Sequence, residues 1–130
     1  IHATVFPFDG ERAAITDVVQ RDDNILKLDV TVAERTEIPK AAGVAEVAVK
    51  DGAGPVSVWA DGQIRIMPTP EVTGIRDTTG AGDGFNAGYL AARLLGQTPE
   101  MAAIAGQRFS AEVIQHLGAR LPKARVPSLP

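Results

Sequence analysis

The sequence predicts an α/β fold in which helices flank a layered sheet. Short runs rich in β-branched residues alternate with longer helical patterns along the chain, which is the order typical of this class. The 130 residues are enough for one domain with a buried core. Hydrophobic residues make up 45% and charged residues 22% of the chain, as in ordinary globular proteins. The sequence therefore predicts a packed domain rather than a disordered segment.

The first third of the chain is expected to hold one strand and two helices. Residues 1–6 are an apolar run with β-branched members that predicts a strand. Residues 11–20 are expected to be helical. Thr31 is a candidate N-cap for a second helix that runs to about Ala42, because Glu34 follows three positions later as in a capping box.

The middle of the chain predicts three strands. Residues 45–49 have the apolar character of a buried strand. Residues 55–59 and 64–66 are expected to pair as a hairpin, because Asp61-Gly62 between alternating apolar residues is the typical signal for a tight turn.

The last part predicts a loop and two helices. Residues 77–83 form a glycine-rich loop, and the following residues to Leu95 are expected to be helical. Thr98 is the candidate N-cap of the last helix, with Pro99 in its first turn and Gly118 at its end. The buried face of this helix is predicted to carry apolar residues at every fourth position: Met101, Ala105, Phe109, Val113 and Leu117.

Composition and charge exclude several classes of function. A net charge of −3 gives no general attraction to nucleic acid or to an anionic membrane surface. No apolar run approaches the ~20 residues of a membrane span. The chain has no cysteine, so it has no disulfide and no thiolate metal site, and a reducing cytoplasm is the expected location. It begins at Ile1 inside a predicted strand, so we expect it to be part of a longer protein.

The stretch most informative about chemistry is the run from residue 77 to residue 86. Gly80, Ala81 and Gly82 leave backbone amides uncovered, so that a ligand can approach them closely. The helix predicted beyond them adds unpaired N–H groups and the positive end of its dipole, which favour an anion. Asp83 would be directed at whatever group reacts there. This arrangement suits phosphoryl transfer, in which catalysis is mainly positioning and neutralisation of charge.

A simpler interpretation of this stretch is a tight turn, with Asp83 as a first-turn residue that stabilises the helix dipole. Two other phosphate motifs are excluded. The sequence has no Gly-Lys-Ser/Thr of a Walker loop, and a Rossmann fingerprint would need a strand directly before it and an acidic residue ~20 positions later. Residues 77–79 place three oxygen-bearing side chains before the glycines, which a simple turn does not require.

The string from Asp77 to Phe85 resembles the second signature of the ribokinase-like, PfkB-type carbohydrate kinases. The longer run to Gly96 is most similar to bacterial 2-dehydro-3-deoxygluconate kinases, and the similarity extends to residues 49–55 and 113–119. The resemblance implies a ribokinase-like fold, of which residues 1–130 would be the C-terminal nucleotide-binding and catalytic part. The N-terminal sugar-binding part and its β lid would be absent.

The resemblance implies a phosphotransferase that moves the γ-phosphate of ATP to a hydroxyl of a sugar or sugar acid, with 2-dehydro-3-deoxygluconate as the best match. Asp83 would be the catalytic base, and Gly80, Ala81 and Gly82 would form the anion hole. A fructokinase or a ribokinase-like enzyme is the nearest alternative. A nucleotide-binding module without turnover of its own is the alternative from another class.

The resemblance also implies contacts with the nucleotide. Lys50, Gly52 and Gly54 match a strand-end loop that borders its phosphates and ribose, although these glycines are two rather than three positions apart. An ordinary hairpin approach is the alternative for this segment. Gln107 matches a polar residue that family members offer to the adenine, and a solvent-facing glutamine is its alternative.

Metal ions and partners follow from the same resemblance. Asp77 and Thr79 match positions that help bind a monovalent cation such as K⁺ in several members. Glu11 matches the glutamate of a Mg²⁺-associated Asn-x-x-Glu motif, but Phe8 stands in place of the asparagine, and an ordinary helix-start glutamate is the alternative. We expect a small-molecule sugar as substrate. We also expect a homo-oligomer or association with the N-terminal part, because a partial sheet leaves an edge and an apolar face to be covered.

Overall fold

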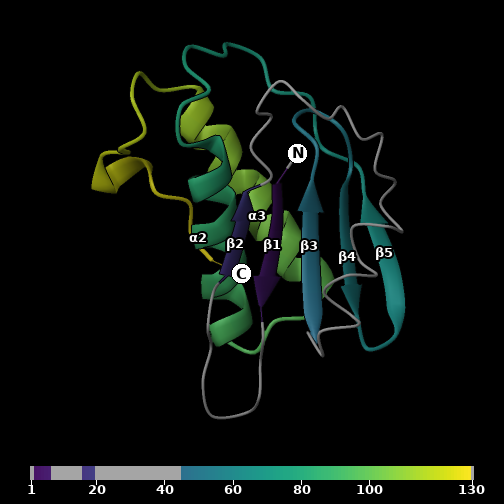
Figure 1. Cartoon of the computed structure of the whole chain (residues 1–130). Coiled ribbons are helices and arrows are strands. Elements are labelled where there is room, and N and C mark those ends of the chain that lie inside the picture. Colours follow the sequence, from purple (N-terminus) through teal and green to yellow (C-terminus); the bar gives the residue numbers. More distant parts are fainter. Residues whose placement is uncertain (1, 7–15, 20–44, 130) are drawn as a thin grey trace. The chain divides into compact units, whose positions relative to one another are not determined.

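The computed structural model describes residues 2–6, 16–19 and 45–129. The chain divides into two compact units, Ile1–Ile66 and Met67–Pro130, where the length predicted a single domain. The first unit holds the sheet and the second holds two helices, α2 and α3 (Figure 1). None of the helices in the described ranges is both long and apolar enough to cross a membrane.

The sheet has five strands in the order β2-β1-β3-β4-β5 (Figure 1). β1 is antiparallel to both β2 and β3, and β3 is antiparallel to β4. All five residues of β3 are buried, whereas most of β5 is exposed at the edge. The bounds of the strands are β1 His2–Phe6, β2 Thr16–Val19, β3 Glu46–Lys50, β4 Val56–Ala60 and β5 Gln63–Met67.

All four predicted strands are confirmed. The runs at residues 1–6 and 45–49 correspond to β1 and β3, and the predicted hairpin corresponds to β4 and β5. Asp61 and Gly62 join the hairpin with φ angles of 51° and 73°. Two successive positive φ angles match the right-handed twist of the flanking strands, which is why an Asp-Gly pair suits this position.

The prediction of a helix over residues 11–20 is wrong where the structure describes that segment. Residues 16–19 form β2, which pairs with β1 in a register that sets Val5 opposite Thr16. Three of these four residues, Thr16, Val18 and Val19, are β-branched and favour a pleated surface. The rest of that predicted helix, and the helix predicted from Thr31, lie outside the described residues.

The helices α2, Ala81–Leu94, and α3, Pro99–Ile114, pack closely because small residues line their contact. A Cβ atom added at Gly88 would lie 2.7 Å from the backbone oxygen of Ala105, and one added at Gly106 would lie 2.8 Å from the ring of Phe85. Neither position can hold a larger residue without moving a helix. This close packing fixes α2, whose first turn carries the candidate site.

The predicted buried face of α3 is only partly correct. Ala105 and Val113 are buried, but Met101 is 37% exposed, and Leu117 lies beyond the last helical residue, Ile114. A spacing of four residues exceeds the 3.6-residue turn by about 40° at each step, so such a stripe drifts away from the packed face. The buried residues of α3 are Pro99, Ala102, Ala103, Ala105, Gly106, Gln107 and Val113. A short 3₁₀ turn, Lys123–Arg125, follows in the C-terminal tail.

Candidate active site

The glycine-rich loop passes directly into α2, which begins at Ala81 rather than after Asp83. Gly80 is the N-cap and has a φ of 81°, a left-handed conformation that side chains disfavour. A Cβ atom at Gly80 would also lie 2.6 Å from the Cβ of Ala119. The amide of Ala81 donates to the carbonyl oxygen of Thr78 at 3.2 Å. Glycine at position 80 therefore allows both the turn and its close packing.

The first turn of α2 keeps backbone donors open. No side chain caps this helix, and in the described part of the chain no acceptor meets the amide of Gly82 or that of Asp83. These amides lie at the positive end of the helix dipole, which is a favourable place for an anion. The carboxylate of Asp83 stands on the same turn and is exposed. Open donors and a carboxylate thus occupy one turn of backbone.

Asp77 joins this loop to the end of α3. One of its carboxylate oxygens accepts the amide of Thr79 at 2.9 Å, and the other accepts the amide of Gly118 at 2.8 Å. The hydroxyl and amide of Thr79, together with the amide of Gly118, hold the pKa of Asp77 below its ordinary value. Asp77 therefore stabilises the conformation of the loop through these hydrogen bonds.

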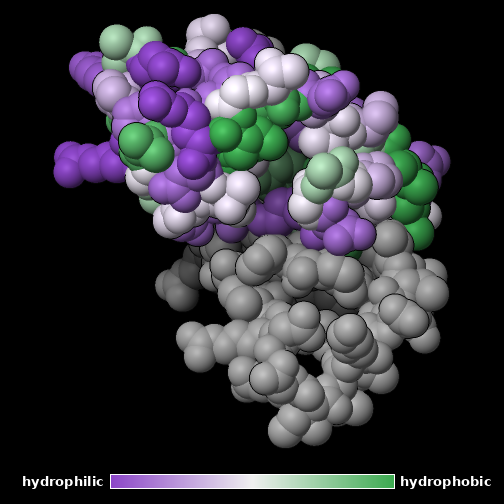
Figure 2. Space-filling view, turned by 90° about the horizontal axis from the view of Figure 1, so that it is seen from above, coloured by the Kyte–Doolittle hydropathy of each residue, from purple (hydrophilic) through white to green (hydrophobic). Residues whose placement is uncertain are grey.

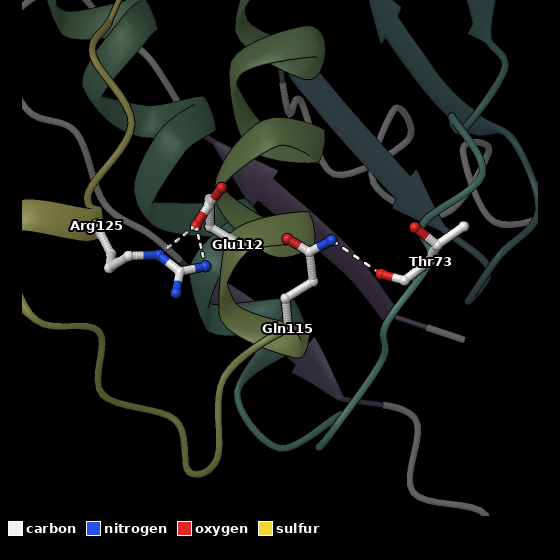
Figure 3. Close-up of polar contacts among 4 residues, drawn as sticks. All are labelled: Thr73, Glu112, Gln115 and Arg125. Carbon is white, nitrogen blue, oxygen red and sulfur yellow. Dashed lines mark hydrogen bonds and ion pairs between the residues drawn. The ribbon is translucent and has the colours of Figure 1, made fainter.

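The sequence did not indicate the turn that receives these contacts. The carbonyl oxygen of Ile114 accepts the amides of Arg76, at 2.8 Å, and Asp77, at 3.2 Å. The side-chain amide of Gln115 donates to the carbonyl oxygen of Thr73 at 2.9 Å (Figure 3). Residues 113–119 belong to the run that resembles the family, but Gly118 was predicted only to end a helix. Contacts across some forty residues leave no signal in local spacing.

The predicted nucleotide-loop residues lie in the other unit. Lys50 is the last residue of β3 and is buried, and Gly52 has a φ of 52° in the connection to β4. The amide of Gly54 donates to the carbonyl oxygen of Asp51 at 2.6 Å. The segment is therefore a tight β-hairpin connection, as the structural alternative predicted. Its role toward a nucleotide stays a prediction.

Gln107 is 8% exposed, so the alternative of a solvent-facing glutamine is wrong. Its side-chain nitrogen donates to the carbonyl oxygen of Pro68 at 3.0 Å and to the hydroxyl oxygen of Thr69 at 3.1 Å. These bonds tie α3 to the segment that follows β5. The predicted contact with adenine stays a prediction.

The predicted metal ligands are only partly described. Glu11 lies outside the described residues. Within the described ranges, no three side chains of the His, Cys, Asp or Glu type gather as a metal cluster. Asp77 and Thr79 are in direct contact, and their binding of a monovalent cation stays a prediction.

Comparison with known proteins identifies relatives of this chain. Residues 16–125 match the model of the pfkB family of carbohydrate kinases. The 2-dehydro-3-deoxygluconokinase of Escherichia coli K12 is 43% identical over 93 residues, which cover 67% of this chain and 29% of that protein. The 2-dehydro-3-deoxygluconokinase of Dickeya dadantii is 35% identical over 113 residues, covering 82% of this chain and 36% of that protein. The chain thus spans about a third of the length of these relatives.

Solved structures agree in fold. The ribokinase of Thermotoga maritima superposes with a TM-score of 0.64 at 34% identity, over 75% of this chain and 32% of that one. An adenosine kinase of Schistosoma mansoni, in complex with 2-fluoroadenosine, gives a TM-score of 0.56 at 27% identity, over 60% of this chain and 24% of that one. The predicted α/β, ribokinase-like fold is confirmed. With the family model matching most of its length, the chain belongs to the pfkB family of carbohydrate kinases.

Proposed function

We propose that this chain forms the phosphate-handling part of a kinase that transfers the γ-phosphate of ATP to a hydroxyl of 2-dehydro-3-deoxygluconate. Family membership supports phosphoryl transfer to a sugar, and the two relatives described above support this sugar acid. The observation that carries the proposal is the first turn of α2. There, two amides that meet no acceptor among the described residues lie on one turn with an exposed carboxylate.

The residues of this turn would act by positioning and by charge. ATP, when bound, supplies the phosphoryl group. The amides of Gly82 and Asp83 would donate to phosphoryl oxygens, where negative charge has to be stabilised during transfer. The carboxylate of Asp83 would accept the proton of the attacking sugar hydroxyl as its oxygen bonds to phosphorus and the bond to ADP breaks. Gly80 and Ala81 would keep the approach free of larger side chains.

The remaining ligand contacts belong to the same proposal. Lys50, Gly52 and Gly54 would border the nucleotide from the β3–β4 hairpin. Gln107 uses its side-chain nitrogen within the protein, which leaves its carbonyl oxygen to accept a hydrogen bond from adenine. Asp77 and Thr79 would help hold a monovalent cation, with the carboxylate of Asp77, which also accepts the amides of Thr79 and Gly118, as the charged ligand.

Association is proposed from the exposed apolar surface. Figure 2 shows hydrophobic residues, in green, among hydrophilic ones on the described surface. On the edge strand β5, Ile64 and Ile66 are 47% and 64% exposed and lie on the same side of the strand, because alternate residues share a face. We expect the chain to pair with the rest of its own protein or with another copy, in the cytoplasm. Sedimentation of the isolated chain as a well-behaved monomer that unfolds cooperatively would contradict this expectation.

The proposed reaction is tested by assaying the full-length protein with ATP and a panel of acceptors: 2-dehydro-3-deoxygluconate, fructose, ribose and adenosine. We expect the highest kcat/KM with 2-dehydro-3-deoxygluconate and one ADP released for each acceptor phosphorylated. A preference for fructose or ribose would keep the kinase and reject the sugar acid. Nucleotide binding without phosphorylation of any acceptor would favour the binding-module alternative.

A further inference from the structure

The α3 turn, defined as residues 115–119, contacts the segment that leads into α2, residues 73–79, at several points. Near the start of that segment, the side-chain amide of Gln115 donates to the carbonyl oxygen of Thr73 (Figure 3). Near its end, the backbone amide of Gly118 donates to the carboxylate of Asp77. Between them, the last helical carbonyl of α3, that of Ile114, accepts two further amides of the segment. The segment is therefore held along its length by one short piece of chain.

The same turn reaches the residue at which α2 begins. Ala119 packs so closely on Gly80 that any side chain at position 80 would collide with it. The carboxylate of Asp77 accepts from Gly118 with one oxygen and from Thr79 with the other. Thr79 directly precedes the N-cap. Because Asp77 is hydrogen-bonded to both Gly118 and Thr79, a displacement of Gly118 would also displace the start of α2. The two hydrogen bonds of Asp77 therefore connect the α3 turn to the start of α2.

We propose that the α3 turn positions the first turn of α2 for phosphoryl transfer, with Gly118 and Gln115 as positioning residues that act through Asp77 and Thr73. The inference rests on the function proposed above. A misplacement of reacting groups by about 1 Å can lower a rate by about a hundredfold, so a remote residue that sets this position affects turnover. A turn that merely packs against α2 would affect stability alone.

Gly118 and Gly96 provide a matched pair of variants. Both follow the end of a helix, with φ angles of 78° and 80°, and a Cβ atom would meet nothing within 4 Å at either position. Alanine strains the left-handed backbone in the same way at both. We expect Gly118→Ala and Gly96→Ala, made in the full-length kinase, to lower the melting temperature by similar amounts. We expect only Gly118→Ala to lower kcat, by about tenfold or more, with KM for the sugar little changed.

Gln115 and Glu112 give a second pair that does not disturb the backbone. Gln115 reaches Thr73, whereas Glu112 pairs with Arg125 of the C-terminal tail at 2.9 Å (Figure 3). We expect Gln115→Ala to lower kcat by about fivefold, the worth of one hydrogen bond. Glu112→Ala should leave kcat within about twofold of the wild type, because an exposed pair contributes little.

The outcomes separate this inference from the proposed function. If Asp83→Asn leaves kcat normal, the proposed function fails. If Asp83→Asn abolishes turnover while Gly118→Ala and Gln115→Ala match their controls in kcat, the proposed function stands and the positioning role is overturned.

Discussion

The two helices of the second unit begin in opposite ways. At the start of α3, the hydroxyl oxygen of Thr98 accepts the amide of Met101 at 3.3 Å, and Pro99 carries no amide hydrogen. At the start of α2, Gly80 offers no side chain, and the amides of Gly82 and Asp83 meet no acceptor in the described part of the chain. One helix start is closed by its own residues, and the other is open.

The difference shows where stability and function diverge in this fold. A capping side chain stabilises a helix by about 1 kcal/mol, and α3 uses one. α2 lacks it and keeps donors that a ligand can use. Departures from local stabilising rules are expected at functional sites. The uncapped start of α2, which packs against the capped α3, therefore supports its assignment as the anion site.

The largest expected effect on this comparison is a loss of nucleotide affinity when a side chain covers the open amides at the start of α2. Gly82→Val, made in the full-length kinase, places a branched side chain beside the free amides and should weaken ATP and ADP binding by about tenfold or more, as lost hydrogen bonds to a charged group would. Gly82→Ala is the graded control, with a smaller loss. Calorimetry measures both. Unchanged affinity in the valine variant would mean that the phosphates lie elsewhere.

A smaller effect is expected from opening the closed start. Thr98→Ala removes the hydroxyl that accepts the amide of Met101, so α3 should lose about 1 kcal/mol of stability. Turnover should stay normal, since this start binds no ligand in our account. A thermal melt and steady-state kinetics on one preparation check both results. A loss of kcat without a loss of stability would break the proposed division of roles.

The smallest effect concerns pH. The hydrogen bonds to Asp77 lower its pKa in the folded state below the value of about 3.9 expected when unfolded. Its stabilising contribution is therefore complete above about pH 4 and is lost as the pH falls through the lowered pKa. Asp77→Asn should melt below the wild type at pH 7, and the gap should close in acid. A gap of the same size from pH 7 to about pH 2 would show that the charge of Asp77 is not its cause.

The parts of the fold that local chemistry fixes were predictable. The Asp61-Gly62 turn predicted the hairpin, and Thr98-Pro99 predicted the start of α3. Pairing between distant segments was not predictable. Residues 16–19 form a strand paired with β1, although a helix was predicted over residues 11–20, and their β-branched residues alone did not decide between the two.

In the candidate site, too, local features could be predicted from the sequence, whereas contacts between distant residues could not. Gly80 and Asp83 stand out in the sequence because a glycine-rich loop before a helix has a local signature. The bond between Asp77 and Gly118, which holds that loop, joins residues 41 positions apart. Nothing in the local pattern of either residue reveals the other, so the positioning turn became visible only in the structure.

The central claim is that the open start of α2 is the catalytic one. It is tested most directly by replacing the acidic residue in the first turn of each helix with its amide. Asp83 stands in the first turn of α2 and Glu100 in that of α3. Asparagine keeps the shape of Asp83 but cannot accept the hydroxyl proton, so Asp83→Asn should lower kcat at least about a hundredfold with ATP binding nearly intact. Glu100→Gln should leave kcat within about twofold, because Glu100 stands in the first turn of the capped helix α3, where no reacting group is proposed. A normal kcat in Asp83→Asn, with a melting temperature lowered as in Glu100→Gln, would contradict the account.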